Sequence, residues 1–210
     1  MNGLKNLKIN KKKFIYLISP NKIYSEFYYD LDQVLRTGKV ALFQLRLKKY
    51  SLKQKIVIGK KILRICKKNN IKFIVNDDPI LSKTLNADGC HLGQKDMTIK
   101  NARKIIRNKI IGVTCHNSIK LAKAAIKENA DYIAFGAFFS TTTKKVKFKA
   151  DIKILNKIKK LTKTPIVAIG GINFDNYKKL LLNNASLLAI SSYVWNNKKY
   201  KPLETIEKLK

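Results

Sequence analysis

The feature that most restricts the fold of this chain is a regular alternation of short apolar segments with helix-like segments. Eight apolar segments are expected to be strands, because they are rich in Ile, Val, Leu and Phe and too short for buried helices. They lie at 14–19, 40–45, 73–75, 89–92, 110–113, 132–135, 166–169 and 187–190. Continuous apolar runs of this kind are typical of strands buried on both faces, as in a parallel sheet.

The segments between the strands carry helical patterns. They lie at 26–36, 51–69, 79–85, 99–107, 118–128, 152–161 and 174–183, and Ser51 is the expected N-cap of the longest. Strands that alternate with helices predict an α/β protein with a parallel sheet, and eight such units predict a (β/α)8 TIM barrel. A doubly wound open sheet is the alternative, although no strand is followed by the GxGxxG turn of a dinucleotide fold.

Length and composition bound the class of protein. We expect a single domain over residues 1–210, with its core at about 14–194, because no linker-like stretch interrupts the chain. The apolar runs are of strand length, far short of a membrane span. Cys66, Cys90 and Cys115 are odd in number and lack CxxC spacing, so neither a disulfide framework nor a zinc site is expected. These features, with no signal peptide evident at the start, favour a cytoplasmic protein that does not contact a membrane.

The chain carries a formal net charge of +32, with 45 Lys+Arg against 13 Asp+Glu. The lysines are spread along the whole sequence, and the aromatic residues are not interleaved with arginine as a base-stacking surface would require. We therefore expect no specific nucleic-acid partner and favour a genome rich in A and T as the source of the lysines. Charge alone still predicts weak, salt-sensitive binding to polyanions.

Scarce acidic residues follow two neighbouring strands of the predicted barrel. Asn76 and Asp77 come directly after one strand, and Asp96 lies in the loop after the next. Two carboxylates at neighbouring strand ends can bind Mg²⁺, which completes its shell with phosphate oxygens of a substrate. The alternative is structural, since Asp77 and Asp78 precede Pro79 and could cap the helix that begins there.

Cationic and hydroxyl side chains follow the other strands. Alternation places Gln44, Arg46 and Lys48 on one side of a strand end, where a guanidinium and an amine suit a phosphate or diphosphate. Further along the chain come Thr114, the loop with Thr141, Thr143 and Lys144, the glycine pair that includes Gly171, and the pair Ser191 and Ser192. The exits of the last two strands are the usual phosphate site of a barrel. The set indicates two phosphorylated substrates, or one substrate with two phosphate ends.

With these motifs the sequence resembles the thiamine-phosphate synthase family, also called thiamine-phosphate pyrophosphorylase, from about residue 14 to 194. The motifs are QLRLK at 44–48, ND at 76–77, ADGCHLGQKD at 87–96, IGVTCH at 111–116, ADYIAFG at 130–136, TTTK at 141–144 and AIGGI at 168–172. At 184–187 the chain has Asn-Ala-Ser-Leu where the family carries Gly-Ala-Asp-Gly.

The resemblance implies a transferase of thiamine biosynthesis. It would join 4-amino-2-methyl-5-hydroxymethylpyrimidine diphosphate to hydroxyethylthiazole phosphate, giving thiamine phosphate and pyrophosphate, with Mg²⁺ as cofactor. The diphosphate would be held by Arg46, Lys48, Asn76 and Lys144, the pyrimidine by Gln44 and Thr114, the thiazole phosphate by Thr141, Thr143, Gly171, Ser191 and Ser192, and Mg²⁺ by Asp77 and Asp96. Arg46, Lys48, Lys144 and Thr114 are the candidate catalytic residues.

Two other functions stay open, and so does assembly into a homo-oligomer. The related thiazole tautomerase branch keeps the barrel and the phosphate site without the diphosphate machinery, and His116 would then be the proton-transfer candidate. A binding protein that holds thiamine precursors without turnover is the second alternative. Ligand binding that does not depend on Asp77 or Asp96 would distinguish it from the synthase.

Overall fold

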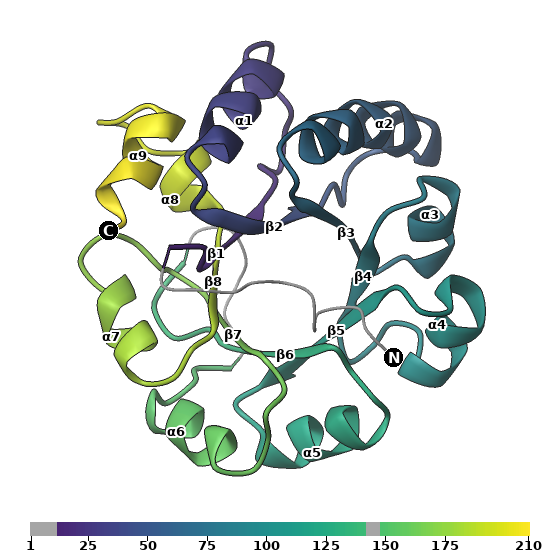
Figure 1. Ribbon diagram of the computed structural model, residues 1–210, viewed down its shortest axis with the longest axis vertical. Coiled ribbons are helices and arrows are strands. Elements are labelled where there is room, and N and C mark those ends of the chain that lie inside the picture. The colour runs from purple at the N-terminus through teal and green to yellow at the C-terminus, as the bar shows by residue number, and fades with distance from the viewer. Residues whose placement is uncertain (1–11, 142–147) are drawn as a thin grey trace.

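A computed structural model describes residues 12–141 and 148–210 of the chain. Eight parallel strands follow one another around a closed barrel in sequence order, and β1 pairs with β8 to close it. The strands, visible around the centre of Figure 1, are β1 (Ile15–Ile18), β2 (Val40–Leu45), β3 (Lys72–Asn76), β4 (Gly89–Leu92), β5 (Ile110–His116), β6 (Tyr132–Phe135), β7 (Ile166–Ile169) and β8 (Leu187–Ile190). The predicted TIM barrel is therefore confirmed, and the open doubly wound sheet is wrong.

Helices surround the barrel and cover its outer face (Figure 1). They are α1 (Phe27–Arg36), α2 (Leu52–Lys68), α3 (Pro79–Thr84), α4 (Ile99–Ile106), α5 (Ile119–Lys127), α6 (Lys153–Lys159), α7 (Tyr177–Leu182), α8 (Ser192–Trp195) and α9 (Pro202–Lys208). Ser51 caps α2 as expected, because its side chain accepts from the amide of Gln54 in a reciprocal capping box. None of the helices in the described part of the chain is long and apolar enough to cross a membrane.

The apolar side chains form two layers, as alternation along a strand requires. On β1, Ile15 and Leu17 point outward into the cluster shared with the helices, whereas Tyr16 and Ile18 point into the barrel. The inner cluster includes Leu42, and its side chains fill the narrow interior of the barrel. The barrel interior is therefore a packed core, and a substrate can only bind at one of its ends.

A repeated contact joins the strands in pairs at the N-terminal end of the barrel. Asp88 precedes β4 and accepts from the amide of Phe73 in β3, at 2.9 Å. Asp131 precedes β6 and accepts from Ile111 in β5 at 2.8 Å, and Ser186 precedes β8 and accepts from Ile166 in β7 at 3.1 Å. The segment 184–187, where the chain departs from the family motif, thus makes the same contact with a serine and lies at the end opposite the predicted site.

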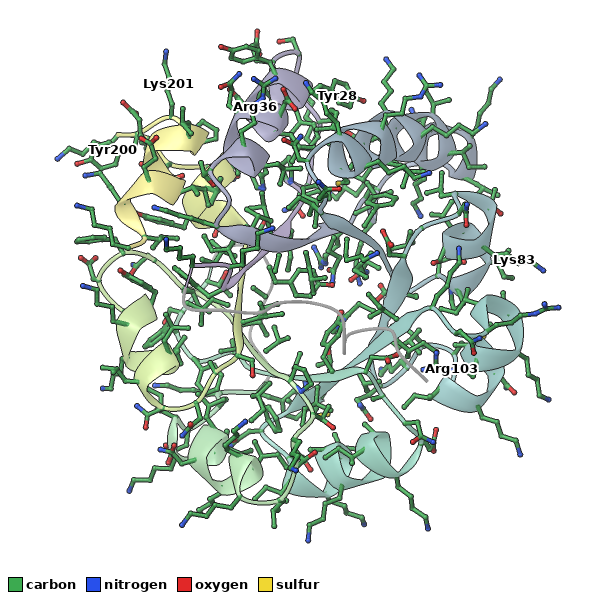
Figure 2. The ribbon with its side chains drawn as sticks, in the orientation of Figure 1. Tyr28, Arg36, Lys83, Arg103, Tyr200 and Lys201 are labelled. Carbon is green, nitrogen blue, oxygen red and sulfur yellow. The ribbon has the colours of Figure 1, made fainter. Side chains whose placement is uncertain are left out.

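The charged side chains lie mainly on the outside of the helical ring. Figure 2 shows the nitrogen tips of long side chains pointing away from the barrel around the whole ring, with Lys83 on α3 and Lys201 beside α9 as labelled examples. Arg103 on α4 is an exception, because its guanidinium turns back to Asp131 at 3.0 Å. The basic charge is therefore distributed over the surface of the described residues and is not concentrated in one block.

Candidate active site

Because all the strands are parallel, their C-terminal ends meet at one end of the barrel, here called the mouth. Alternating residues at the end of β2 and directly after it lie at three depths of the mouth. Gln44 is buried inside the barrel, Arg46 is half-buried, and Lys48 is exposed at the rim. Leu45 and Leu47 point the other way and are buried in the outer apolar cluster. The predicted alternation of polar residues at this strand end is therefore seen in the structure.

Arg46 is held in the mouth by its neighbours from the β1 exit. Its amide donates to the hydroxyl of Ser19 at 2.9 Å, and its guanidinium donates to the side-chain oxygen of Asn21 at 3.3 Å. Burial lowers the pKa of Arg46, and the nearby carboxylate of Asp77 only partly opposes that effect. A partly desolvated guanidinium facing a single carboxylate is well suited to receive a further anion.

Asp77 and Asp78 have separate tasks. Asp78 caps α3, because its carboxylate accepts from the amide of Leu81 at 2.9 Å. Asp77 has a left-handed backbone (φ 64°), and its amide donates to the carbonyl of His91 at 2.7 Å. The capping interpretation is therefore confirmed for Asp78, while the carboxylate of Asp77 turns toward the mouth and pairs with the amine of Lys48 at 3.2 Å.

Asp96 lies beside Asp77. Its carboxylate accepts from the amide of Gly93 at 2.7 Å, which holds the loop after β4 in place. Burial raises the pKa of Asp96, and the adjacent carboxyl of Asp77 acts in the same direction. Two neighbouring carboxylates that repel one another are stabilised by a cation between or beside them. Their oxygen donor set suits Mg²⁺, which takes few protein carboxylates.

The carboxylate pair is a modest metal-binding group. Within residues 12–141 and 148–210, no three His, Cys, Asp or Glu side chains come together as a ready-made metal site. Asn76, the last residue of β3, is half-buried next to the pair and lies opposite His91 in the register of β3 and β4. A hard cation at Asp77 and Asp96 would therefore depend on water or substrate oxygens for much of its coordination shell.

A chain of hydrogen bonds crosses the barrel directly below the mouth. We call it the barrel relay: Gln44 (β2), Tyr16 (β1), Tyr132 (β6), His91 (β4) and Thr114 (β5). Gln44 donates to the hydroxyl of Tyr16 at 2.8 Å, which lies 2.8 Å from the hydroxyl of Tyr132. The two nitrogens of His91 contact the Tyr132 hydroxyl at 2.9 Å and the Thr114 hydroxyl at 2.8 Å.

Three members of the barrel relay, Tyr16, His91 and Tyr132, are not among the site residues expected from the sequence. The tyrosines look like ordinary strand aromatics, and their hydroxyls meet across 116 positions of the chain. One signal was available. A side chain at Gly112 would meet the ring of Tyr132, since an added Cβ would lie 1.8 Å from its Cζ atom. A glycine in the middle of β5 thus marks a place where a large ring from the next strand must fit.

The barrel relay is uncharged. Burial lowers the pKa of His91 to about 4, and the opposing effect of the Asp77 carboxylate is smaller. Burial also raises the pKa values of Tyr16 and Tyr132 above the ordinary range of tyrosine. The charged groups of the mouth therefore stand on a neutral, hydrogen-bonded floor.

The other side of the mouth is formed by main chain. After β6, the amides of Phe138 and Phe139 donate to the carbonyls of Ile169 and Gly170 at 3.1 and 3.0 Å. This brings the loop that carries Thr141 against Gly171, whose φ is +62°. An added Cβ at Gly171 would lie 2.1 Å from the carbonyl oxygen of Ser140, so a side chain has no room there.

Ser191 and Ser192 lie beside this loop, at the exit of β8. Ile169 of β7 pairs with Ala189 of β8, so Gly171 and Ser191 each lie two residues beyond that pair. The Ser191 hydroxyl donates to the carbonyl of Ser19 at 3.1 Å, and Ser192 begins α8. Thr141, Gly171 and the two serines thus share one side of the mouth. Thr143 and Lys144 lie outside the described residues.

His116 is the last residue of β5 and therefore also lies at the mouth. Its backbone is left-handed (φ 53°), and its ring packs against the ring of Phe148 with 4.3 Å between centroids.

A shallow hollow of about 680 Å³ lies at the opposite end of the barrel, lined by residues that include Lys67, Lys72 and Lys109. None of the expected site residues lines that hollow, so the chemistry of the mouth does not extend to it.

Comparison with known proteins agrees with this geometry. Residues 15–194 match the family model described as thiamine monophosphate synthase. The thiamine-phosphate synthase of Pelagibacter ubique is 65% identical over 208 residues, covering 99% of this chain and 100% of the relative. That of Hyphomonas neptunium is 38% identical over 190 residues, covering 87% and 86%. The solved thiamine phosphate pyrophosphorylase of Pyrococcus furiosus superposes with a TM-score of 0.84 at 30% identity, covering 96% and 95%. The chain therefore belongs to the thiamine-phosphate synthase family, whose members are transferases.

Proposed function

We propose that this enzyme joins 4-amino-2-methyl-5-hydroxymethylpyrimidine diphosphate to hydroxyethylthiazole phosphate, giving thiamine phosphate and pyrophosphate. The observation that carries the proposal is the cluster at the exits of β2, β3 and β4. There Arg46 and Lys48 face the carboxylates of Asp77 and Asp96. Such a cluster can receive a diphosphate and a divalent cation together, whereas a simple phosphate site would not require the acidic pair.

The cationic side chains would bind the diphosphate and favour its departure. Arg46 can contact two phosphate oxygens at once, and Lys48, now paired with Asp77, supplies a point charge beside them. Asn76 adds an amide at the same strand end, and Lys144 is assigned to the diphosphate by its motif alone. Bound by Asp77 and Asp96, Mg²⁺ would neutralise the charge that develops on the leaving pyrophosphate.

The pyrimidine ring would lie over the barrel relay, with Gln44 and Thr114 as its nearest partners. The bond between the methylene carbon and the diphosphate oxygen breaks, and its electron pair leaves with pyrophosphate. The electron-rich aminopyrimidine stabilises the methylene cation until the thiazole nitrogen donates its lone pair to form the new C–N bond. No protein nucleophile is needed, and burial raises the pKa of the Cys115 thiol, next to Thr114 in β5, to about 12, which keeps it unreactive.

The thiazole phosphate would occupy the main-chain side of the mouth. Thr141 and Thr143 would offer hydroxyls, Gly171 would allow the backbone to approach the phosphate closely, and Ser191 and Ser192 would contact it from β8. Because this site faces the cationic cluster across the mouth, the two substrates would meet above the barrel relay. Positioning the nitrogen toward the methylene carbon and excluding water are then the main tasks of the protein.

The tautomerase alternative is less well supported. It assigns proton transfer to His116, whose ring packs against Phe148, and it gives no role to the cluster of Arg46, Lys48, Asp77 and Asp96. A binding protein without turnover likewise would not require a carboxylate pair beside the cations.

The test is release of inorganic pyrophosphate by purified protein with Mg²⁺ and both phosphorylated precursors. We expect release that requires both precursors and stops when a chelator is added. Release from the pyrimidine diphosphate alone would indicate a hydrolase. No release, with the thiazole phosphate still bound, would favour the tautomerase branch or a binding protein.

A further inference from the structure

We propose that the barrel relay runs in one direction, and that this direction makes Thr114 a hydrogen-bond donor and Gln44 an acceptor toward the pyrimidine. Tyr132, which does not reach the mouth, is then a positioning residue that sets the polarity of the substrate site. The inference rests on the proposed function for the identity of the ligand, but the direction of the relay is a property of the protein alone.

The direction follows from the orientation of the Gln44 amide, together with a count of the protons at the two tyrosines. The side-chain nitrogen of Gln44 can only donate, so the Tyr16 hydroxyl uses one lone pair to accept from it. Tyr16 has a single proton left to give, and the Tyr132 oxygen lies 2.8 Å away. With the Gln44 amide in this orientation and the tyrosine pair reversed, Tyr132 would donate to Tyr16, and the fully buried Tyr16 proton would have no acceptor along the chain. Leaving a buried donor unsatisfied costs about 1–3 kcal/mol.

The same count fixes the other half of the relay. Tyr132 accepts from Tyr16 and therefore donates its own proton to Nδ1 of His91, at 2.9 Å. A histidine that accepts at Nδ1 carries its proton on Nε2, which then donates to the hydroxyl of Thr114 at 2.8 Å. The Thr114 proton is left to point away from His91, toward the half-buried mouth.

The two ends of the relay thus present opposite polarity. Gln44 gives its side-chain nitrogen to Tyr16, so its side-chain oxygen is the group that can accept from a ligand. Thr114 offers a proton. An aminopyrimidine matches this pair, because its exocyclic amine donates and its ring nitrogen accepts. An oxopyrimidine reverses both groups and would leave them unmatched, so the relay selects the amino form of the substrate.

Nuclear magnetic resonance of the imidazole nitrogens tests the direction in the protein without substrates. The chain has only two histidines, so a His116→Asn variant assigns the signals of His91. We expect His91 to carry its proton on Nε2. A proton on Nδ1 would mean that the relay is reversed, and would overturn the inference whether or not the protein makes thiamine phosphate.

The Tyr132→Phe variant tests the consequence for the substrate. It removes the hydroxyl and keeps the ring that fills the space above Gly112. We expect a mixture of His91 tautomers and a rise of about tenfold in KM for the pyrimidine diphosphate, with KM for the thiazole phosphate changed less than about twofold. The preference of this variant for the aminopyrimidine over its oxo analogue should also be smaller than that of the wild-type protein.

Tyr177→Phe is the matched control. Tyr177 is as fully buried as Tyr132, but its hydroxyl accepts from the amide of Lys210 at 2.9 Å, at the C-terminus. This variant measures the general effect of losing a buried tyrosine hydroxyl. If both variants showed the same kinetics and the same His91 signals, Tyr132 would have only a structural role and the inference would be wrong.

Discussion

The two sides of the barrel mouth are built from different materials. The charged side consists of Arg46, Lys48, Asp77 and Asp96 at the exits of β2 to β4. The glycine side consists of main chain at the exits of β6 and β7, where Gly170 and Gly171 have φ values of +106° and +62°. A charge can be removed without moving the backbone, whereas a glycine that packs on a carbonyl cannot gain a side chain without displacing it. Substitutions on the charged side should therefore lower turnover, whereas substitutions on the glycine side should change the shape of the mouth and the stability of the protein.

The largest effect is expected for Asp77→Asn on the charged side. The substitution keeps the size of the side chain and removes one of the two carboxylates proposed to bind Mg²⁺. We expect Mg²⁺-dependent pyrophosphate release to fall by about 100-fold or more. The free energy of unfolding should change by less than about 1 kcal/mol, because the Lys48 ion pair that is lost is largely exposed. Steady-state kinetics and urea unfolding measure the two quantities.

Asp78→Asn is the control for that experiment. It removes the same charge one residue along the chain, and asparagine caps a helix about as well as aspartate. The carboxylate of Asp78 already accepts a hydrogen bond from the amide of Leu81. A similar loss of turnover in both variants would show that general charge near the mouth matters, and would remove Asp77 from the metal assignment.

On the glycine side, Gly171→Ala should show the next largest effect. A Cβ there would lie 2.1 Å from the Ser140 carbonyl, and the left-handed backbone adds strain of about 1–2 kcal/mol. The loop that carries Thr141 must then move. We expect KM for the thiazole phosphate to rise about tenfold or more, with KM for the pyrimidine diphosphate nearly unchanged, and the protein to lose stability.

Gly38→Ala separates strain from collision. Gly38 has a similar left-handed backbone (φ +71°), but among the described residues no atom beyond its two chain neighbours lies within 4 Å of the position of an added Cβ. It should lose about 1–2 kcal/mol of stability and keep both KM values. If Gly171→Ala behaved in the same way, the close contact with Ser140 would have no part in binding the thiazole phosphate.

Local sequence patterns predicted most of the strands and the charged side of the mouth. Five strands, among them 40–45 and 187–190, have the predicted bounds, because apolar runs between polar turns define them. The charged side was also predictable, since alternation along β2 fixes where Arg46 and Lys48 point. β5 runs three residues past its predicted end, and α8 and α9 were not predicted.

Other parts of the site depend on contacts between distant segments. Which of Asp77 and Asp78 caps α3 is decided by the positive φ of Asp77, which sequence spacing does not give. The barrel relay depends on Tyr16 and Tyr132 meeting across the closed barrel, and nothing local to either residue specifies that contact. Such features follow from closure of the sheet, so they appear only once the eight strands are placed together.

The third prediction concerns the titration of His91, which lies beneath the charged side. His91 lies under Asp77, whose carboxylate favours a protonated ring, yet burial lowers the pKa of His91 to about 4. Unfolding would return it to the ordinary value of about 6.5. Between these values the unfolded chain binds a proton that the folded protein does not, so stability is fully present above pH 6.5 and is lost as the pH falls.

We expect this one residue to lower the free energy of unfolding by about 2 kcal/mol between pH 7.5 and pH 5, since each pH unit within the window contributes about 1.4 kcal/mol. Urea unfolding in the presence of a chelator measures the slope. The chain has only two histidines, so substitution of His91 isolates its contribution. The slope should be lost in the His91→Gln variant. A wild-type protein without the slope would mean that His91 is protonated in the folded state, and the neutral floor under the charged side would then not exist.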